Sequence, residues 1–178
     1  MIIENNILER VEETDIVHGT VEIPNYIEKI EAFAFKELDA LEYINLLQHI
    51  KCVGIHAFLD CKHLKSVMFF NDNCKIGAGL FAGCEELRMV RFPQNLKQIG
   101  SLTFFGCTDL QVDCMPDKIT AIGNGAYQDC TSLEVIIIPS GVNEIQINQF
   151  QGCKNLKNII FKEKQYTYDD LSEYERFT

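Results

Sequence analysis

Apolar side chains recur along this chain with a period of 23 residues, through six consecutive units without insertion or deletion. Each unit carries an aromatic residue at the same position, and a second apolar position, usually Cys, follows it three residues later. A Leu lies six positions after the aromatic, and Ile or Val lies five positions before it. The six aromatic residues are Phe35, Phe58, Phe81, Phe104, Tyr127 and Phe150. Because a constant period of this length is typical of stacked repeats, the units should share one conformation.

Each unit is expected to contain one short β-strand and an irregular return. Residues 133–138 are rich in β-branched side chains and end at Pro139, which suits the last position of a strand. All four prolines, Pro24, Pro93, Pro116 and Pro139, occupy this same phase of the repeat. Residues 142–150 place apolar side chains at 142, 145 and 150 among polar ones. This spacing favours a turn and a 3₁₀-like return over a long helix.

The unit reads I-P-x-x-V-x-x-I-x-x-x-A-F-x-x-C-x-x-L and resembles the BspA-like class of leucine-rich repeat over roughly residues 21–161. Leu38 replaces Cys in the first unit, Gln149 replaces Ala in the last, and Phe70 and Asn73 replace Pro and an apolar residue in the third. The resemblance implies a right-handed leucine-rich-repeat solenoid with a parallel β-sheet on one face, short irregular, 3₁₀ or strand returns on the other, and little α-helix. It also implies a role in protein binding or adhesion.

Physical reasoning supports a solenoid independently, since one unit of this size cannot enclose a core, whereas stacked units bury equivalent side chains in continuous columns. The aromatic residues should form one column. A second column should hold Cys61, Cys84, Cys107, Cys130 and Cys153. Because Leu38 takes this place in the first unit, the position is interpreted as a small apolar filler.

The eight cysteines are expected to be free thiols. Equivalent positions on stacked strands lie roughly 4.8 Å apart with parallel side-chain directions, which does not fit disulfide geometry. Cys52, Cys74 and Cys114 fall outside the column, and Cys114 is expected to face solvent on its strand.

Three segments are predicted: a divergent N-terminal repeat or cap over residues 1–20, the leucine-rich repeats over 21–161 (six 23-residue units and a final strand), and a C-terminal cap or tail over 162–178. Residues 169–177 begin with two acids, which favours a helix start. Leu171, Tyr174 and Phe177 would then lie on one face of a short helix.

Composition and charge narrow the function classes. The 178 residues are 47% apolar and 24% charged, as in a soluble globular protein. With 26 acids against 16 Lys and Arg, the net charge of -10 excludes the usual nucleic-acid binders and disfavours anionic membranes. No apolar run is long enough for membrane insertion, and the N-terminus shows no signal peptide. The compartment is therefore unknown: cytoplasmic with reduced cysteines as the sequence stands, or secreted or cell-surface if a leader precedes it.

No catalytic motif is recognisable, and the sequence predicts neither an enzyme nor a cofactor. Cys52, His56, Cys61 and His63 lie within twelve residues, but they lack the C-x₂-C and H-x₃-H spacings of common zinc sites. The repeat also assigns Cys61 to the core, so no metal site is predicted. Gly-x-Gly occurs at equivalent places, residues 77–79 and 123–125, where turn geometry explains it better than phosphate binding.

A protein partner of unknown identity is expected on the exposed sheet face. In strands of the form L-x-x-I-x-I, the intervening residues point outward, and several of them are apolar. The candidate partner-binding residues are Met68, Met89, Arg91, Val112, Cys114, Val135, Ile137 and Ile160. Exposed apolar patches of this kind mark interfaces. Strand propensity, a covering domain and self-association through the same face are the alternatives. The predicted function is a non-catalytic protein-binding scaffold.

Asp113 interrupts this pattern, because its phase should point inward. A lone buried carboxylate is costly. Local strand distortion that turns Asp113 toward water is the favoured interpretation, and a functional carboxylate is the alternative.

Overall fold

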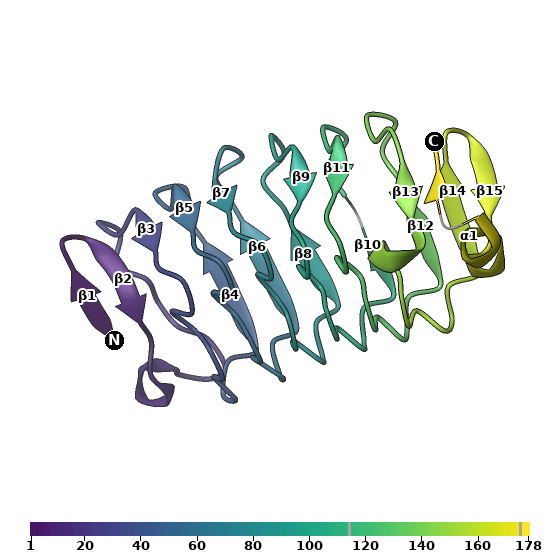
Figure 1. The fold of residues 1–178 in the computed structure, drawn as a ribbon. Helices are drawn as coiled ribbons and strands as arrows, with labels where there is room; N and C mark the ends of the chain where they lie inside the picture. The colour runs from purple at the N-terminus through teal and green to yellow at the C-terminus, as the bar shows by residue number, and fades with distance from the viewer. Residues whose placement is uncertain (114, 175) are drawn as a thin grey trace.

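The computed structural model describes residues 1–113, 115–174 and 176–178. The chain winds into a β-solenoid of about seven turns with mostly parallel strands and little helix, and its termini lie at opposite ends of the stack (Figure 1). This confirms the predicted fold class. The predictions made for Cys114, and for the side chains of Val112, Asp113 and Tyr174, lie outside the described part of the structure.

Strands of two to four residues line one side of the solenoid. They are β4 (Tyr43–Leu46), β6 (Ser66–Phe69), β8 (Met89–Arg91), β10 (Val112–Asp113), β12 (Val135–Ile137) and β14 (Asn158–Phe161). The first three form one parallel sheet, and the last three form another together with the antiparallel β15 (Lys164–Tyr166). Ile44 pairs with Val67 and Val67 with Val90, so the register joins residues of the same repeat phase. The outward side of these strands is called the sheet face.

Two-residue strands form a second ladder on another side of the stack (Figure 1). They are β3 (Lys29–Ile30), β5 (Cys52–Val53), β7 (Lys75–Ile76), β9 (Gln98–Ile99), β11 (Ala121–Ile122) and β13 (Ile145–Gln146). The strands β3, β5 and β7 continue the N-terminal hairpin of β1 (Ile2–Glu4) and β2 (Ile7–Arg10), β9 pairs with β11, and β13 pairs with β16 (Arg176–Phe177). This ladder therefore breaks between β7 and β9 and again between β11 and β13.

The turn after each short strand adds a third ladder of backbone hydrogen bonds. The Phe58 N–H donates to the Leu80 carbonyl at 3.0 Å, and the Phe81 N–H donates to Thr103 at 2.9 Å. Gly79 adopts a φ of +60°, a conformation that glycine accepts without steric cost. A Cβ at Gly77 would lie 2.4 Å from the Ile55 nitrogen. Close packing between turns therefore explains the Gly-x-Gly pair.

The core is built from the two predicted columns. All six repeat aromatics are fully buried, and successive ring centroids lie 4.7 to 5.7 Å apart. Each column cysteine donates its thiol to the carbonyl of the aromatic residue in the preceding repeat, as Cys61 does to Phe35 at 2.8 Å and Cys153 does to Tyr127 at 2.9 Å. Leu38, in the first repeat, occupies the same position without such a bond. The apolar-filler interpretation was therefore incomplete, because the thiol also satisfies a buried carbonyl.

The described cysteines are free thiols. Burial raises the pKa of Cys61 to about 12, and burial likewise raises the pKa of Cys84, Cys107 and Cys130 well above the ordinary value of 9.0. These column thiols are accordingly protonated at neutral pH and are poor nucleophiles.

Additional elements cover both ends of the stack. At the N-terminus, Leu8 of β2 is in register with Ile30, and the 3₁₀ helix η1 (Glu13–Asp15) follows. At the C-terminus, α1 (Tyr168–Tyr174) lies next to the 3₁₀ helix η2 (Ile147–Gln149), and its Leu171 is fully buried. Phe177 lies beyond this helix, in β16, where its ring contacts that of Tyr166.

Candidate functional site

Apolar side chains gather on the sheet face, where the strand pattern placed them. Met89 is 53% exposed, Ile137 59% and Ile160 36%. Met68 and Val135 are half-buried beside them. The inward residues between them pack in the core, so the same strands bury one face and leave another apolar face in contact with solvent.

The N-terminal half of this face carries three large apolar residues that sequence reasoning left out of the candidate set. Tyr43 is 48% exposed, Leu47 47% and Phe70 43%. Leu47 and Phe70 occupy the repeat phase that is Pro in other units, and this substitution was the signal available in the sequence. We define the sheet-face strip as Tyr43, Leu47, Met68, Phe70, Met89, Val135, Ile137 and Ile160.

Arg91 borders the strip and fixes one of its rings. Its guanidinium carbon lies 5.9 Å from the Phe70 ring centroid, within cation–π range. The same guanidinium donates to the Phe69 carbonyl and pairs with the Asp72 carboxylate at 3.3 Å. Arg91 therefore holds Phe70 in place more than it offers a free charge to a ligand.

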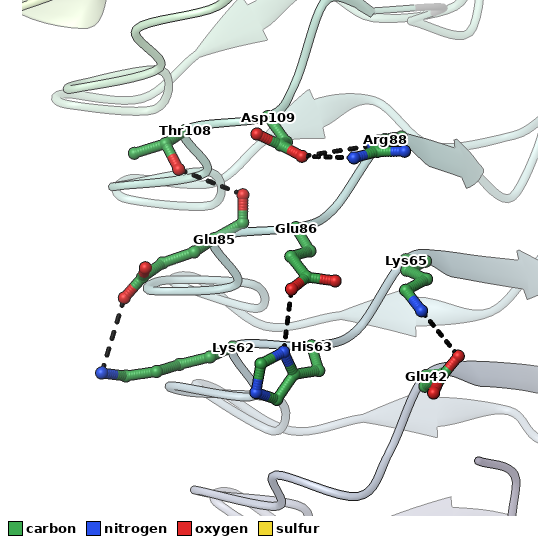
Figure 2. Close-up of polar contacts among 9 residues, drawn as sticks. All are labelled: Glu42, Lys62, His63, Lys65, Glu85, Glu86, Arg88, Thr108 and Asp109. Carbon is green, nitrogen blue, oxygen red and sulfur yellow. Dashed lines mark hydrogen bonds and ion pairs between the residues drawn. The ribbon is translucent and has the colours of Figure 1, made fainter.

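A series of polar contacts between adjacent repeats runs along the loops that lead into the strands (Figure 2). The contacts join Lys65 to Glu42 at 2.7 Å, His63 to Glu86 at 2.9 Å, Lys62 to Glu85 at 3.5 Å, Arg88 to Asp109 at 2.7 Å, and the Thr108 hydroxyl to the Glu85 carbonyl at 3.2 Å. The Glu42 carboxylate raises the pKa of Lys65. Because these pairs are largely exposed, each stabilises the fold only slightly. Their arrangement ties neighbouring loops together at the border of the strip.

Three of the four residues weighed as metal ligands serve separate contacts, and the fourth, Cys52, is a partly buried free thiol. The Cys61 thiol bonds in the core, and His63 pairs with Glu86. His56 stacks on Phe33 with ring centroids 5.5 Å apart. Within residues 1–113, 115–174 and 176–178, no group of three or more His, Cys, Asp and Glu side chains is arranged to hold a metal ion.

The backbone of Asp113 remains in register with Ile136 in β12, while its side chain lies outside the described part.

No helix in the described part of the chain has the length and apolar character needed to cross a membrane.

The sequence model of the BspA type leucine rich repeat region matches in six copies, over residues 15–113 and 57–173. No curated protein matches the chain.

Solved structures of similar fold come from several bacteria. A T. pallidum leucine-rich repeat protein has a TM-score of 0.76 and 26% identity, with 88% of this chain and 75% of that one covered. A Bacteroides ovatus leucine-rich repeat protein has a TM-score of 0.76 and 29% identity, covering 87% and 40%. A leucine-rich cell surface protein of Faecalibacterium prausnitzii has a TM-score of 0.68 and 24% identity, covering 86% and 50%. The present chain thus spans half of the last protein and less than half of the second.

Proposed function

Because the chain belongs to the BspA-type leucine-rich repeat family, we propose that it is a non-catalytic scaffold that binds a protein partner through the sheet-face strip. One observation carries the proposal: large apolar side chains between 36% and 59% exposed lie on the outward side of the strands in both parallel sheets, or one residue beyond those strands. Contiguous exposed apolar surface is characteristic of interaction sites.

The strip has the amino-acid composition that is typical of the central, buried part of protein–protein interfaces. Tyr43 and Phe70 supply aromatic surface, and Met68 and Met89 supply adaptable, polarisable surface. Because Tyr43, Met68 and Met89 lie on paired strands, little backbone conformational freedom is lost on binding. The cation–π contacts of Lys65 with Tyr43 and of Arg91 with Phe70 restrict the rings further. A partner with a complementary apolar surface would therefore meet a pre-ordered face.

The experiment compares two surface variants of the full chain, each with two introduced positive charges, in affinity capture with mass spectrometry. Met89→Lys/Ile137→Lys places two charges within the strip, and Val17→Lys/Ile55→Lys places the same charges at residues that are 60% and 50% exposed elsewhere. Loss of a captured protein with the first variant and its retention with the second is expected. Equal capture by both variants would contradict a partner site on the strip.

Self-association through the strip is the second candidate, favoured by the same exposed apolar residues. Sedimentation equilibrium distinguishes it from binding of another protein. If the wild type is a dimer and Met89→Lys/Ile137→Lys is a monomer, the strip binds a second copy of this chain and not another protein. A monomeric wild type would remove this candidate.

An adhesion role at a cell surface is a variant of the proposed function. The similar F. prausnitzii structure is described as a cell surface protein, and at 24% identity it supports the fold alone. Protease treatment of intact source cells tests this variant. Degradation of the protein in intact cells is expected for surface display, whereas protection until lysis would place it inside the cell.

A further inference from the structure

The break in the ladder between β7 and β9 exposes backbone groups that are paired elsewhere in the stack. At equivalent places the Gly77 N–H donates to the Val53 carbonyl at 2.9 Å, and the Gly123 N–H donates to Ile99 at 2.8 Å. The corresponding bond from the Gly100 N–H to the Ile76 carbonyl is not formed in the described structure. The Gly100 N–H and the Ile76 carbonyl are therefore both left without the bond that the equivalent groups form elsewhere in this ladder.

The second break, between β11 and β13, is closed by a side chain. Gln149 donates its Nε2 to the Ile122 carbonyl at 2.8 Å and accepts the Gln146 N–H at 2.9 Å, so one amide bridges both strands. Thr103 occupies the same repeat position beside the first break. Its hydroxyl donates to the Gly100 carbonyl of its own repeat at 2.8 Å. Thr103 thus does not bridge to β7, and that gap stays open.

A substitution in the third repeat shapes a groove at this gap. Asn73 stands where other units place an apolar residue, and it is exposed, while the neighbouring Cys74 is buried. The groove between the third and fourth repeats has partly exposed Ile76 and Leu96 among its lining residues. Polar lining residues include Asn73, Asn95, Lys75, Lys97, Gln98 and Gly100. We call this the β7–β9 groove.

Three side-chain acceptors of the groove are engaged in hydrogen bonds or ion pairs. The Asn73 Oδ1 accepts from Asn95 Nδ2 at 2.8 Å, and the Asn95 Oδ1 accepts from the Lys118 ammonium. The lining carboxylate, Asp72, pairs with Arg91 at 3.3 Å. At the break the Ile76 carbonyl remains as an acceptor and the Gly100 N–H as a donor, and the unpaired ammonium groups of Lys75 and Lys97 add cationic donors, so the groove is suited to a ligand that supplies anionic acceptors.

Two lysines make the groove locally positive in an acidic protein. Lys75 and Lys97 are both exposed, and neither forms an ion pair with the described acidic residues. Because the whole chain carries a net charge of -10, an anion is repelled by most of the surface. The two lysines would therefore select both the place and the orientation in which a carboxylate ligand binds.

We propose that the β7–β9 groove binds a short acidic peptide segment. Its carboxylates accept from the ammonium groups of Lys75 and Lys97, a peptide carbonyl accepts the Gly100 N–H, and the methylene stems of its side chains lie on Ile76 and Leu96. The lining residues include no aromatic ring on which a sugar could stack, which favours a peptide over an acidic saccharide. The site is separate from the sheet-face strip and does not depend on the proposed function.

The test is fluorescence anisotropy of a labelled peptide of alternating Glu and Gly, titrated with the full chain at low ionic strength. Lys75→Gln/Lys97→Gln is compared with Lys154→Gln/Lys164→Gln, which removes the same charge at exposed lysines outside the groove. The groove variant should weaken binding about five- to tenfold, and the control should change it by less than about twofold. Unchanged unfolding midpoints for both variants establish that they fold.

Three results would overturn the proposal. They are equal affinity of wild type and the groove variant, equal weakening by both variants, and binding of an oligogalacturonate in place of the peptide. The first two would show that the groove lysines make no specific contact. The third would assign the site to an acidic saccharide. A parallel titration of the Met89→Lys/Ile137→Lys variant should leave peptide affinity unchanged, which separates this test from that of the strip.

Discussion

Replacement of Phe104 by Ala tests the stacked aromatic column at its centre. The ring is fully buried and contacts Phe81 at 5.7 Å and Tyr127 at 5.2 Å between centroids, with Phe92 edge-on at 5.8 Å. Phe-to-Ala changes in cores cost about 3–5 kcal/mol through lost transfer energy and cavity formation. Because each repeat contacts only its neighbours, the cavity also weakens the junction between the two halves of the stack.

Urea unfolding followed by circular dichroism measures this cost. With a slope of about 2 kcal/mol per molar urea, the midpoint should fall by about 1.5–2.5 M. The adjacent Phe105 is 38% exposed, and Phe105→Ala is the matched control, with an expected loss of under about 1 kcal/mol. An unchanged midpoint for Phe104→Ala, or equal losses for the two variants, would refute the buried column as the source of stability.

Three other substitutions or conditions probe the remaining contacts. Gln149→Ala removes the amide that joins Ile122 to Gln146 and should lower the free energy of unfolding by about 1–3 kcal/mol. The exposed Gln151→Ala is the control and should change it little. Equal unfolding midpoints for the two variants would contradict the bridge. Leu171→Asp should lower stability by about 3 kcal/mol or more because Leu171 is fully buried, whereas the exposed Ser172→Asp should not. Burial raises the pKa of the Cys61 thiol from 9.0 to about 12. The stability that the protonated thiol contributes is therefore complete below pH 9 and is lost as the pH rises through 12. The unfolding midpoints should fall across this pH window, and they should fall less steeply in Cys61→Ala. An identical pH profile in that variant would exclude the thiol as the cause.

The 23-residue period predicted which side chains enter the core, because identical spacing forces identical positions on successive turns. It therefore placed the aromatic and cysteine columns and the outward phase of Met89 and Ile137. Period alone does not determine the gaps between turns. Those depend on single departures such as Thr103 and Gln149, whose hydrogen bonds become visible only when neighbouring backbones are placed.

The thiol-to-carbonyl bonds of the cysteine column were hidden for the same reason. A donor such as Cys61 and its acceptor, the Phe35 carbonyl, lie 26 residues apart and belong to different repeats. Leu47 and Phe70 were not predicted as partner-binding residues because other repeats have Pro at this position, and Pro marks the end of a strand. They are exposed because the inward–outward alternation of β4 and β6, which end at Leu46 and Phe69, places the next residue on the outward side.

Site-specific photocrosslinking tests directly whether the sheet-face strip contacts a protein partner. A benzophenone side chain is placed at Met89, which is 53% exposed on the strip, or at Ile55, which is 50% exposed outside it. A partner site on the strip predicts a crosslinked protein from position 89 that is absent from position 55. Crosslinking of a partner from position 55 alone, or equally from both positions, would contradict it.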